Sequence, residues 1–207
     1  DNKHVLRVDE ERTDSINDDN LSNRLEKMIL ENDFDVVIFE DYNKGLLSKN
    51  LIQKAITAAQ QKGIPTIVDP KKDNFFAYEG VDVFKPNLKE IKEGLNVDFD
   101  VQSEAALSEN VEILRAKLDA KGILLTLSEH GIYFQNSKDV YREPAHKRNI
   151  IDVSGAGDTV VSVAALALAC GLESEYMMRI ANLAGGLVCE KVGVVPIQKL
   201  DLLQASK

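Results

Sequence analysis

The sequence contains few cysteines and no long apolar run. Cys170 and Cys189 are its only cysteines, and both lie in apolar helical patterns, which predicts core residues in a reducing compartment rather than a disulfide pair. No apolar run reaches the roughly 18–20 residues that cross a bilayer, and no signal peptide opens the sequence. We therefore expect a cytoplasmic protein with no membrane partner. Asp1, rather than Met, is the first residue, which indicates a piece of a longer chain.

Positive charge and histidine are also scarce. The 207 residues include 25 Lys and Arg against 34 Asp and Glu, which gives a net charge of −9. A nucleic-acid backbone is bound by clustered cations, so this charge argues against a nucleic-acid partner. A small anion held at one local site is still allowed. The three histidines are scattered, without Cys or carboxylates at ligand spacing, which argues against a zinc site.

Short apolar runs alternate with amphipathic helical patterns along most of the chain. This alternation is typical of an open, largely parallel sheet covered by helices. We predict an α/β fold with a doubly wound, mostly parallel sheet in a three-layer αβα arrangement. The patterns place strands at 5–8, 35–40, 64–68, 81–85 and 122–127, a hairpin at 131–135 and 140–143, and helices at 21–29, 48–62, 87–95, 103–120, 156–170, 174–191 and 197–205.

Polar and turn residues follow each predicted parallel strand. In sheets of this kind, ligands bind outside the carboxyl ends of the strands. The recurrence of such residues at one edge is what a binding site would produce, although each stretch alone is also an ordinary loop. The four stretches are 41–45, 69–71, 86–90 and 128–131.

The segment from Asp152 to Thr159, with the sequence DVSGAGDT, stands directly before the apolar helical pattern at 160–170. The start of a helix offers unpaired backbone N–H groups and the positive end of the dipole, and small residues let a phosphate approach the backbone. A carboxylate at this place, Asp158, suits a general base that accepts a proton from an attacking hydroxyl. The alternative is an aspartate that merely starts a helix after a tight turn. From the residues alone both interpretations stand.

These motifs resemble those of the ribokinase-like, PfkB-type carbohydrate kinases. The block from Asp152 to Thr159 is similar to the family's C-terminal signature, 87–90 to its N-x-x-E motif, and 125–131 to its T-x-G-x-x-G nucleotide segment, with Ser128 at the first glycine. Within the family the chain is most similar to the kinase domain of bifunctional heptose-phosphate kinase/ADP-heptose synthases. That likeness rests on 41–45, 69–71, 86–90, 181–185 and 191–193.

The resemblance implies an ATP-dependent phosphoryl transfer to a sugar hydroxyl, in its sharpest form to the anomeric position of a heptose 7-phosphate. Asp158 would be the base, and Gly155, Ala156 and Gly157 would form the anion hole for the γ-phosphate. Mg²⁺ would be held through waters by Asn87 and Glu90, a pair that also reads as a capping box. The remaining implied sites are a nucleotide site (Lys71, Thr126, Ser128, Gly131, Asn182), a substrate contact (Lys44) and a K⁺ or Na⁺ site (Asp152, Gly193).

The resemblance covers residues from about 6 to 203 but not the whole family domain. We expect 1–20 to be a remnant of the lid or a linker, and 21–207 to be the C-terminal two-thirds of the kinase core. The family's N-terminal part, with its glycine-rich sugar-binding stretch, has no counterpart here, nor does the nucleotidyltransferase domain of the bifunctional enzyme. Other hypotheses are therefore a different PfkB-type sugar or nucleoside kinase, or a nucleotide-binding fragment that is inactive alone. Family members also dimerise through the lid, so a homodimer is allowed.

Overall fold

The structure, a computed structural model, describes residues 8, 10, 13–16, 18–146 and 148–206. The strand predicted at 5–8 lies outside these residues except for Val8, which is not in a strand. The described sheet has six strands that follow one another in chain order. They are β1 (Val37–Glu40), β2 (Thr66–Asp69), β3 (Val83–Phe84), β4 (Gly122–Thr126), β5 (Ile132–Asn136) and β6 (Val140–Glu143).

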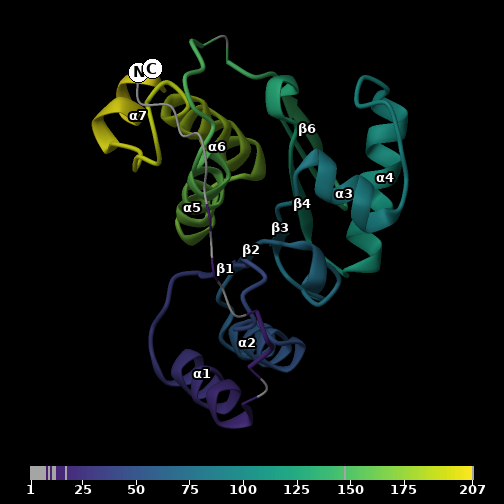
Figure 1. The fold of residues 1–207 in the computed structure, drawn as a ribbon, viewed down its shortest axis with the longest axis vertical. Coiled ribbons are helices and arrows are strands. Elements are labelled where there is room, and N and C mark those ends of the chain that lie inside the picture. Colours follow the sequence, from purple (N-terminus) through teal and green to yellow (C-terminus); the bar gives the residue numbers. More distant parts are fainter. Residues whose placement is uncertain (1–7, 9, 11–12, 17, 147, 207) are drawn as a thin grey trace.

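The first four strands are parallel, and the last two run antiparallel as the predicted hairpin. Helices connect or cover these strands, and Figure 1 shows α5 and α6 on one side of the sheet with α3 and α4 on the other. The helices are α1 (Asp19–Glu31), α2 (Lys49–Lys62), α3 (Leu88–Leu95), α4 (Glu104–Lys117), α5 (Ala156–Ala169), α6 (Ser174–Val188) and α7 (Lys199–Ala205). The three-layer α/β prediction is confirmed, and several ends differ from the predicted ones by two or three residues.

Alternate residues of the central strands enter two different cores. In β2, Ile67 packs with residues of α5 and α6, whereas Val68 packs with residues of α2 and α4. Leu124 in β4 joins the first of these cores and Ile123 the second. Side chains alternate between the faces of a strand, so a sheet covered on both faces needs apolar residues at nearly every position. This explains why the strands read as continuous apolar runs.

Local signals place the helix ends. The Ser48 hydroxyl accepts a hydrogen bond from the Leu51 N–H at the start of α2, and Gly63 ends the helix, both as predicted. Asn87 and Glu90 form a capping box at the start of α3. Capping therefore fixes where α2 and α3 begin. It also fixes where the loops that follow β1 and β3 end.

Both cysteines are free thiols, but only one is a core residue. Cys189 is buried, and burial together with the nearby Asp152 raises the pKa of its thiol. Cys170 is exposed, so its predicted core position was wrong. Cys170 is the C-cap residue of α5, where the chain leaves the core. Leu166 on the same helix is 64% exposed, so α5 has a solvent side that its uniformly apolar sequence conceals.

Candidate active site at the carboxyl ends of the strands

The carboxyl ends of the parallel strands carry charged residues. Glu40 and Asp69 are the last residues of β1 and β2, and they are partners in the parallel register. Lys85 follows β3 directly, and its N–H donates to Val68 O at 2.9 Å. The strand ladder thus continues to the edge, where it holds three charged side chains side by side. Helix α5, which packs against β1 and β2, brings its N-terminus to the same edge.

The turn before α5 has the geometry that the sequence predicted. Gly155 has a φ of 79°, in the left-handed region that favours glycine. Thr159 N–H donates to Gly155 O at 2.9 Å, so the helical hydrogen bonds begin at this residue. Asp158 lies in the first turn and is exposed. Ala156 N–H donates to Val153 O at 3.2 Å. The next N–H groups of the first turn have no partner within a helix, so they can receive an anion.

Gly157 faces the charged edge of the sheet. A Cβ built at Gly157 would lie 3.8 Å from Asp69 Oδ2 and 3.8 Å from Lys85 Nζ. The turn at 155–157, for which the resemblance implies an anion hole, therefore lies next to the Asp69–Lys85 pair. A side chain at position 157 would occupy the space between this turn and the pair.

Three carboxylates meet at this edge. Oxygens of Glu40, Asp69 and Asp158 lie within 4.8 Å of one another. Burial raises the pKa of Glu40 from 4.5 to about 7, with further contributions from Asp69 and Asp158, and with Lys85 and Lys71 acting in the opposite direction. Like charges at this separation disfavour full ionisation of the group. The surroundings of Glu40 therefore favour its protonated form.

Two lysines balance part of this negative charge. Lys85 Nζ lies 3.1 Å from Asp69 Oδ1, and its side chain is only 3% exposed. Lys71 Nζ lies 3.5 Å from the same oxygen and 3.6 Å from Glu90 Oε1. Burial alone would lower the pKa of Lys71, but Asp69 and Glu90 outweigh it and the pKa lies above its ordinary value. Lys71, predicted as a phosphate contact, is thus a cation on the rim of the site.

The predicted magnesium residues hold each other in place. Glu90 N–H donates to Asn87 Oδ1 at 2.9 Å, and Asn87 N–H donates to Glu90 Oε2 at 2.8 Å. The other carboxylate oxygen of Glu90, Oε1, takes no part in the capping box and faces Lys71. Amide and carboxylate oxygens are suitable donors for Mg²⁺. With one oxygen of each side chain already accepting a backbone N–H, the pair fits contact with hydrated Mg²⁺ rather than a full coordination shell.

The predicted nucleotide residues fall into two places. Thr126 ends β4 and forms a bridge with Asn87, which puts it next to the α3 N-terminus. Ser128 and Gly131 lie at the ends of a 3-10 turn, and Asn182 Nδ2 donates to Pro144 O at 3.0 Å. Gly131 has a φ of 88°, and a Cβ there would come within 2.1 Å of Glu143 O. Gly131 and Asn182 therefore meet the same 143–144 segment.

Asp152 and Gly193, predicted to border a monovalent cation, are in direct contact. Gly193 N–H donates to Asp152 Oδ2 at 3.0 Å, and Ser154 N–H donates to Asp152 Oδ1 at 2.9 Å. Asp152 thereby ties the loop after α6 to the turn before α5. Since both of its oxygens accept N–H groups, Asp152 fits the role of a brace for a cation loop.

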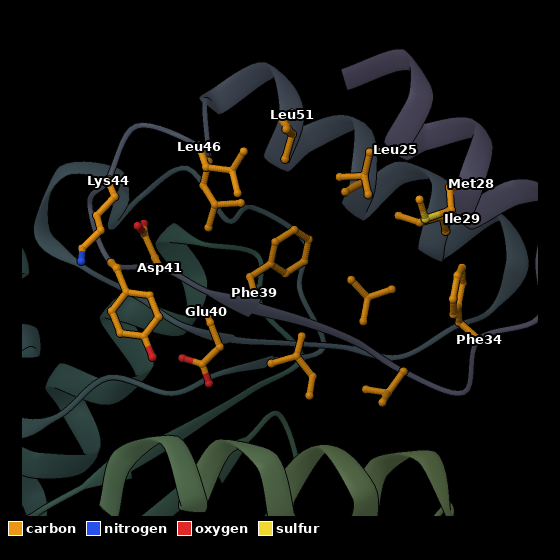
Figure 2. A pocket seen from close by; sticks show the side chains of 16 residues that line it. Leu25, Met28, Ile29, Phe34, Phe39, Glu40, Asp41, Lys44, Leu46 and Leu51 are labelled. Atoms are coloured by element: carbon orange, nitrogen blue, oxygen red, sulfur yellow. The ribbon is translucent and has the colours of Figure 1, made fainter. Parts of the chain in front are cut away.

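The predicted substrate residue, Lys44, lies on the loop after β1 and lines a cavity of 630 Å³. Figure 2 shows Lys44, Glu40 and Asp41 at one end of this cavity, and Leu25, Met28 and Phe34 at the other. Asp41 is 2% exposed, and its Oδ2 accepts a 2.7 Å hydrogen bond from the Tyr78 hydroxyl. This bond holds the β1 end of the loop in place, so the cavity has a fixed polar end.

Glu40 and Lys85 were missed as site residues, and Asp69 was noticed only as part of a strand-end stretch. One signal could have found all three. Each is a charged residue at the end of an otherwise apolar strand, where the sheet edge and a helix N-terminus converge. Charged side chains at such positions are buried at a cost unless they are paired or functional.

The pattern of the family described as pfkB family carbohydrate kinase matches residues 2–199 of the chain. The chain belongs to this family. It is 33% identical over 210 residues to the Bifunctional protein HldE of Geotalea uraniireducens, covering 98% of the chain and 41% of that protein. The corresponding protein of Koribacter versatilis is 34% identical over 204 residues, with coverage of 98% and 42%.

Solved structures show the same fold at lower identity. Phosphofructokinase-2 from Escherichia coli in complex with potassium superposes with a TM-score of 0.80 at 21% identity, covering 92% of this chain and 63% of that one. Arabidopsis thaliana ribokinase complexed with ribose and ATP gives a TM-score of 0.73 at 17% identity, covering 92% and 59%. This pfkB-family chain thus spans less than half the length of its HldE relatives and about three-fifths of these solved kinases.

Proposed function

We propose that the chain carries the phosphoryl-transfer part of an ATP-dependent sugar kinase. The observation that supports this most is the position of Asp158, beside the Gly155–Gly157 turn and over a charged strand edge. In the proposed step, Asp158 accepts the proton of the sugar hydroxyl. The hydroxyl oxygen forms a bond to the γ-phosphorus while the bond from that phosphorus to the ADP oxygen breaks.

The turn and the rim lysine serve the phosphoryl group in this step. Backbone N–H groups at the start of α5 receive charge that develops on the transferred phosphoryl, an effect for which one lost donor costs about 10²–10³ in rate in other enzymes. Lys71, held by Asp69 and Glu90, adds a positive charge at the same edge. Positioning and electrostatics of this kind are most of what phosphoryl transfer requires from a protein.

Mg²⁺ and a monovalent cation are the proposed inorganic cofactors. Asn87 and Glu90 would hold hydrated Mg²⁺, which supplies charge neutralisation between the phosphates when it is bound. Asp152 and Gly193 brace the loop that would surround K⁺. The residues proposed for these two cation sites also form hydrogen bonds that stabilise the fold.

The most specific version of this proposal names D-glycero-D-manno-heptose 7-phosphate as the acceptor. It would be phosphorylated at the anomeric hydroxyl during synthesis of ADP-heptose, a precursor of the lipopolysaccharide core. The likeness to HldE proteins along 98% of the chain supports this choice. Lys44 lies at the polar end of the cavity, and in this proposal its positive charge would attract the acceptor phosphate. We place this reaction in the cytoplasm, and a homodimer is the proposed assembly. In the described part of the chain, no helix is long and apolar enough to cross a membrane.

A second candidate is a nucleotide-binding part that turns over only when joined to the rest of a longer chain. The share of the relatives that this chain spans, 41–42%, favours it. The cavity beside β1 also favours it, because β1 has a strand partner on one side only among the described residues.

An assay of ADP release separates these candidates. The chain is incubated with Mg·ATP and, in turn, heptose 7-phosphate, fructose 6-phosphate and ribose, while calorimetry follows binding of an unreactive ATP analogue. Release that depends on heptose 7-phosphate supports the first function, and release with another sugar redirects the substrate. Nucleotide binding without release supports the second candidate. Neither binding nor release would contradict both.

A further inference from the structure

Glu40 differs from its two acidic neighbours in what surrounds it. It is half-buried at the end of β1, and Figure 2 shows its side chain on the opposite side of the strand from Phe39 and Asp41, toward the helix layer formed by α5. Asp69 has Lys85 and Lys71 against it. Within the described part of the chain, the Glu40 carboxylate accepts no hydrogen bond and forms no ion pair.

The three carboxylates therefore have different electrostatic surroundings. Lys85 and Lys71 place positive charge beside Asp69, and Asp158 lies at the positive end of the α5 dipole. Glu40 meets burial and the two negative charges, and Lys85 and Lys71 offset these effects only in part, without direct contact. Its pKa of about 7, raised by burial and then by Asp69 and Asp158, follows from this arrangement. Tyr42, on the same loop, faces the same carboxylates and contributes no positive charge.

We propose that Glu40 is a positioning residue of the phosphoryl-transfer site, which holds a proton beside Asp158 while nucleotide is bound and so keeps Asp158 ionised as the base. This inference rests on the proposed function. The proton comes from solvent and stays on Glu40, while the sugar proton goes to Asp158. A nucleotide phosphate adds negative charge to the edge, so binding favours the protonated form of Glu40 further.

The first test uses the protein without nucleotide. Carbon-13 NMR of labelled glutamate side chains follows the Glu40 carboxyl between pH 4 and 9, with Glu40→Gln to assign the signal. We expect a midpoint near neutral pH that moves to lower pH in Asp158→Asn and stays in place in Asp33→Asn, whose carboxylate is fully exposed. An ordinary midpoint near 4.5, or one that Asp158→Asn leaves unchanged, overturns the proposal.

The second test measures protons taken up on binding. Calorimetric titrations of Mg·ADP at pH 7.5, in two buffers of different ionisation enthalpy, give the number of protons bound per nucleotide. We expect uptake in the native protein and in Glu31→Gln, and its loss in Glu40→Gln. Uptake that persists in Glu40→Gln overturns the proposal. The native protein should also bind Mg·ADP about fivefold more weakly at pH 8 than at pH 6, which is the effect of one charge about 5 Å away in water. Glu40→Gln should bind Mg·ADP about equally at the two pH values.

The outcomes separate this inference from the function beneath it. Complete absence of nucleotide binding counts against the proposed function, and the NMR midpoint still decides the state of Glu40. If Mg²⁺ without nucleotide moves the Glu40 midpoint to low pH, then a cation, rather than a proton, balances the negative charge of the three carboxylates. That result would overturn the role proposed for Glu40 while leaving kinase activity intact.

Discussion

Lys85 Nζ lies 3.1 Å from Asp69 Oδ1, and their side chains are only 3% and 8% exposed. Both residues leave water on folding, which is unfavourable for either charge alone. Their contact lies beside Gly157, where an added Cβ would be 3.8 Å from both Asp69 Oδ2 and Lys85 Nζ, so the pair borders the turn before α5. A buried pair at this point fixes where the end of β2 meets the start of α5, and it brings a cation close to the first turn of that helix.

Replacing Lys85 by methionine should destabilise the protein. The apolar stem is kept, but Asp69 loses its nearer partner, and breaking a buried ion pair costs about 3–5 kcal/mol. Lys71 Nζ remains 3.5 Å from Asp69 Oδ1. We therefore expect the free energy of unfolding, measured with urea, to fall by about 3 kcal/mol. The double variant Asp69→Asn/Lys85→Met should be more stable than Lys85→Met. Lys121→Met is the matched control, because Lys121 pairs with Asp82 but is 76% exposed, and it should change stability by less than about 1 kcal/mol.

Gly157→Ala should separate folding from ligand binding. The added Cβ meets its nearest neighbours at 3.8 Å, an ordinary contact, and alanine favours helix by about 1 kcal/mol over glycine. We therefore expect equal or higher stability by thermal unfolding, together with weaker Mg·ATP binding by calorimetry. Gly157→Val should weaken binding further. Unchanged affinity in both variants would remove the 155–157 turn from the phosphate site.

Asp158→Asn tests the base. General-base catalysis is worth about 10²–10⁴ in rate, so sugar-dependent ADP release should fall by at least about 100-fold, while nucleotide affinity stays the same or rises a few-fold because a negative charge is lost near the phosphates. Asp33→Asn should keep native activity. A variant Asp158→Asn with native turnover would contradict the mechanism, and one with lost affinity as well would point to a binding role.

Glu90→Gln tests the two roles of the capping box. The amide oxygen of glutamine can still accept the Asn87 N–H, so stability should change by less than about 1 kcal/mol. The charge that faces Lys71 and that would hold hydrated Mg²⁺ is lost, so the Mg²⁺ concentration needed for half-maximal nucleotide binding should rise several-fold. Glu90→Ala should lose stability and Mg²⁺ response together. Equal Mg²⁺ response in native protein and Glu90→Gln would leave only the capping role.

The sequence was sufficient for the order and type of the elements, because apolar periodicity and capping residues are local signals. Ser48 and Gly63 place α2 without any tertiary information. The Gly155–Asp158 turn was predictable for the same reason. Cys170 shows the limit, since a uniformly apolar helix does not reveal which of its sides faces water.

Much of the site could not be predicted because it depends on register between distant strands. Glu40 and Asp69 are 29 positions apart in the sequence and become neighbours only through the parallel pairing of β1 with β2. Lys85 joins them from β3, and Asp158 from α5. The raised pKa of Glu40 follows from this meeting and from burial, so no local pattern contains it.

The pH dependence of stability should report Glu40 directly. Its pKa is raised from 4.5 to about 7 in the folded protein. Between these values the folded state binds a proton that the unfolded chain has released, so the free energy of unfolding falls as the pH rises through this window. Solvent screens a half-exposed group, so we expect a fall of about 1 kcal/mol in the native protein relative to Glu40→Gln. Urea unfolding at pH 4.5, 6, 7 and 8 measures the difference, which should level off above pH 7.5. In the Asp158→Asn background the fall should be smaller, because one of the charges that raises the pKa of Glu40 is gone. A fall of equal size there would mean that Asp158 does not contribute to the raised pKa of Glu40.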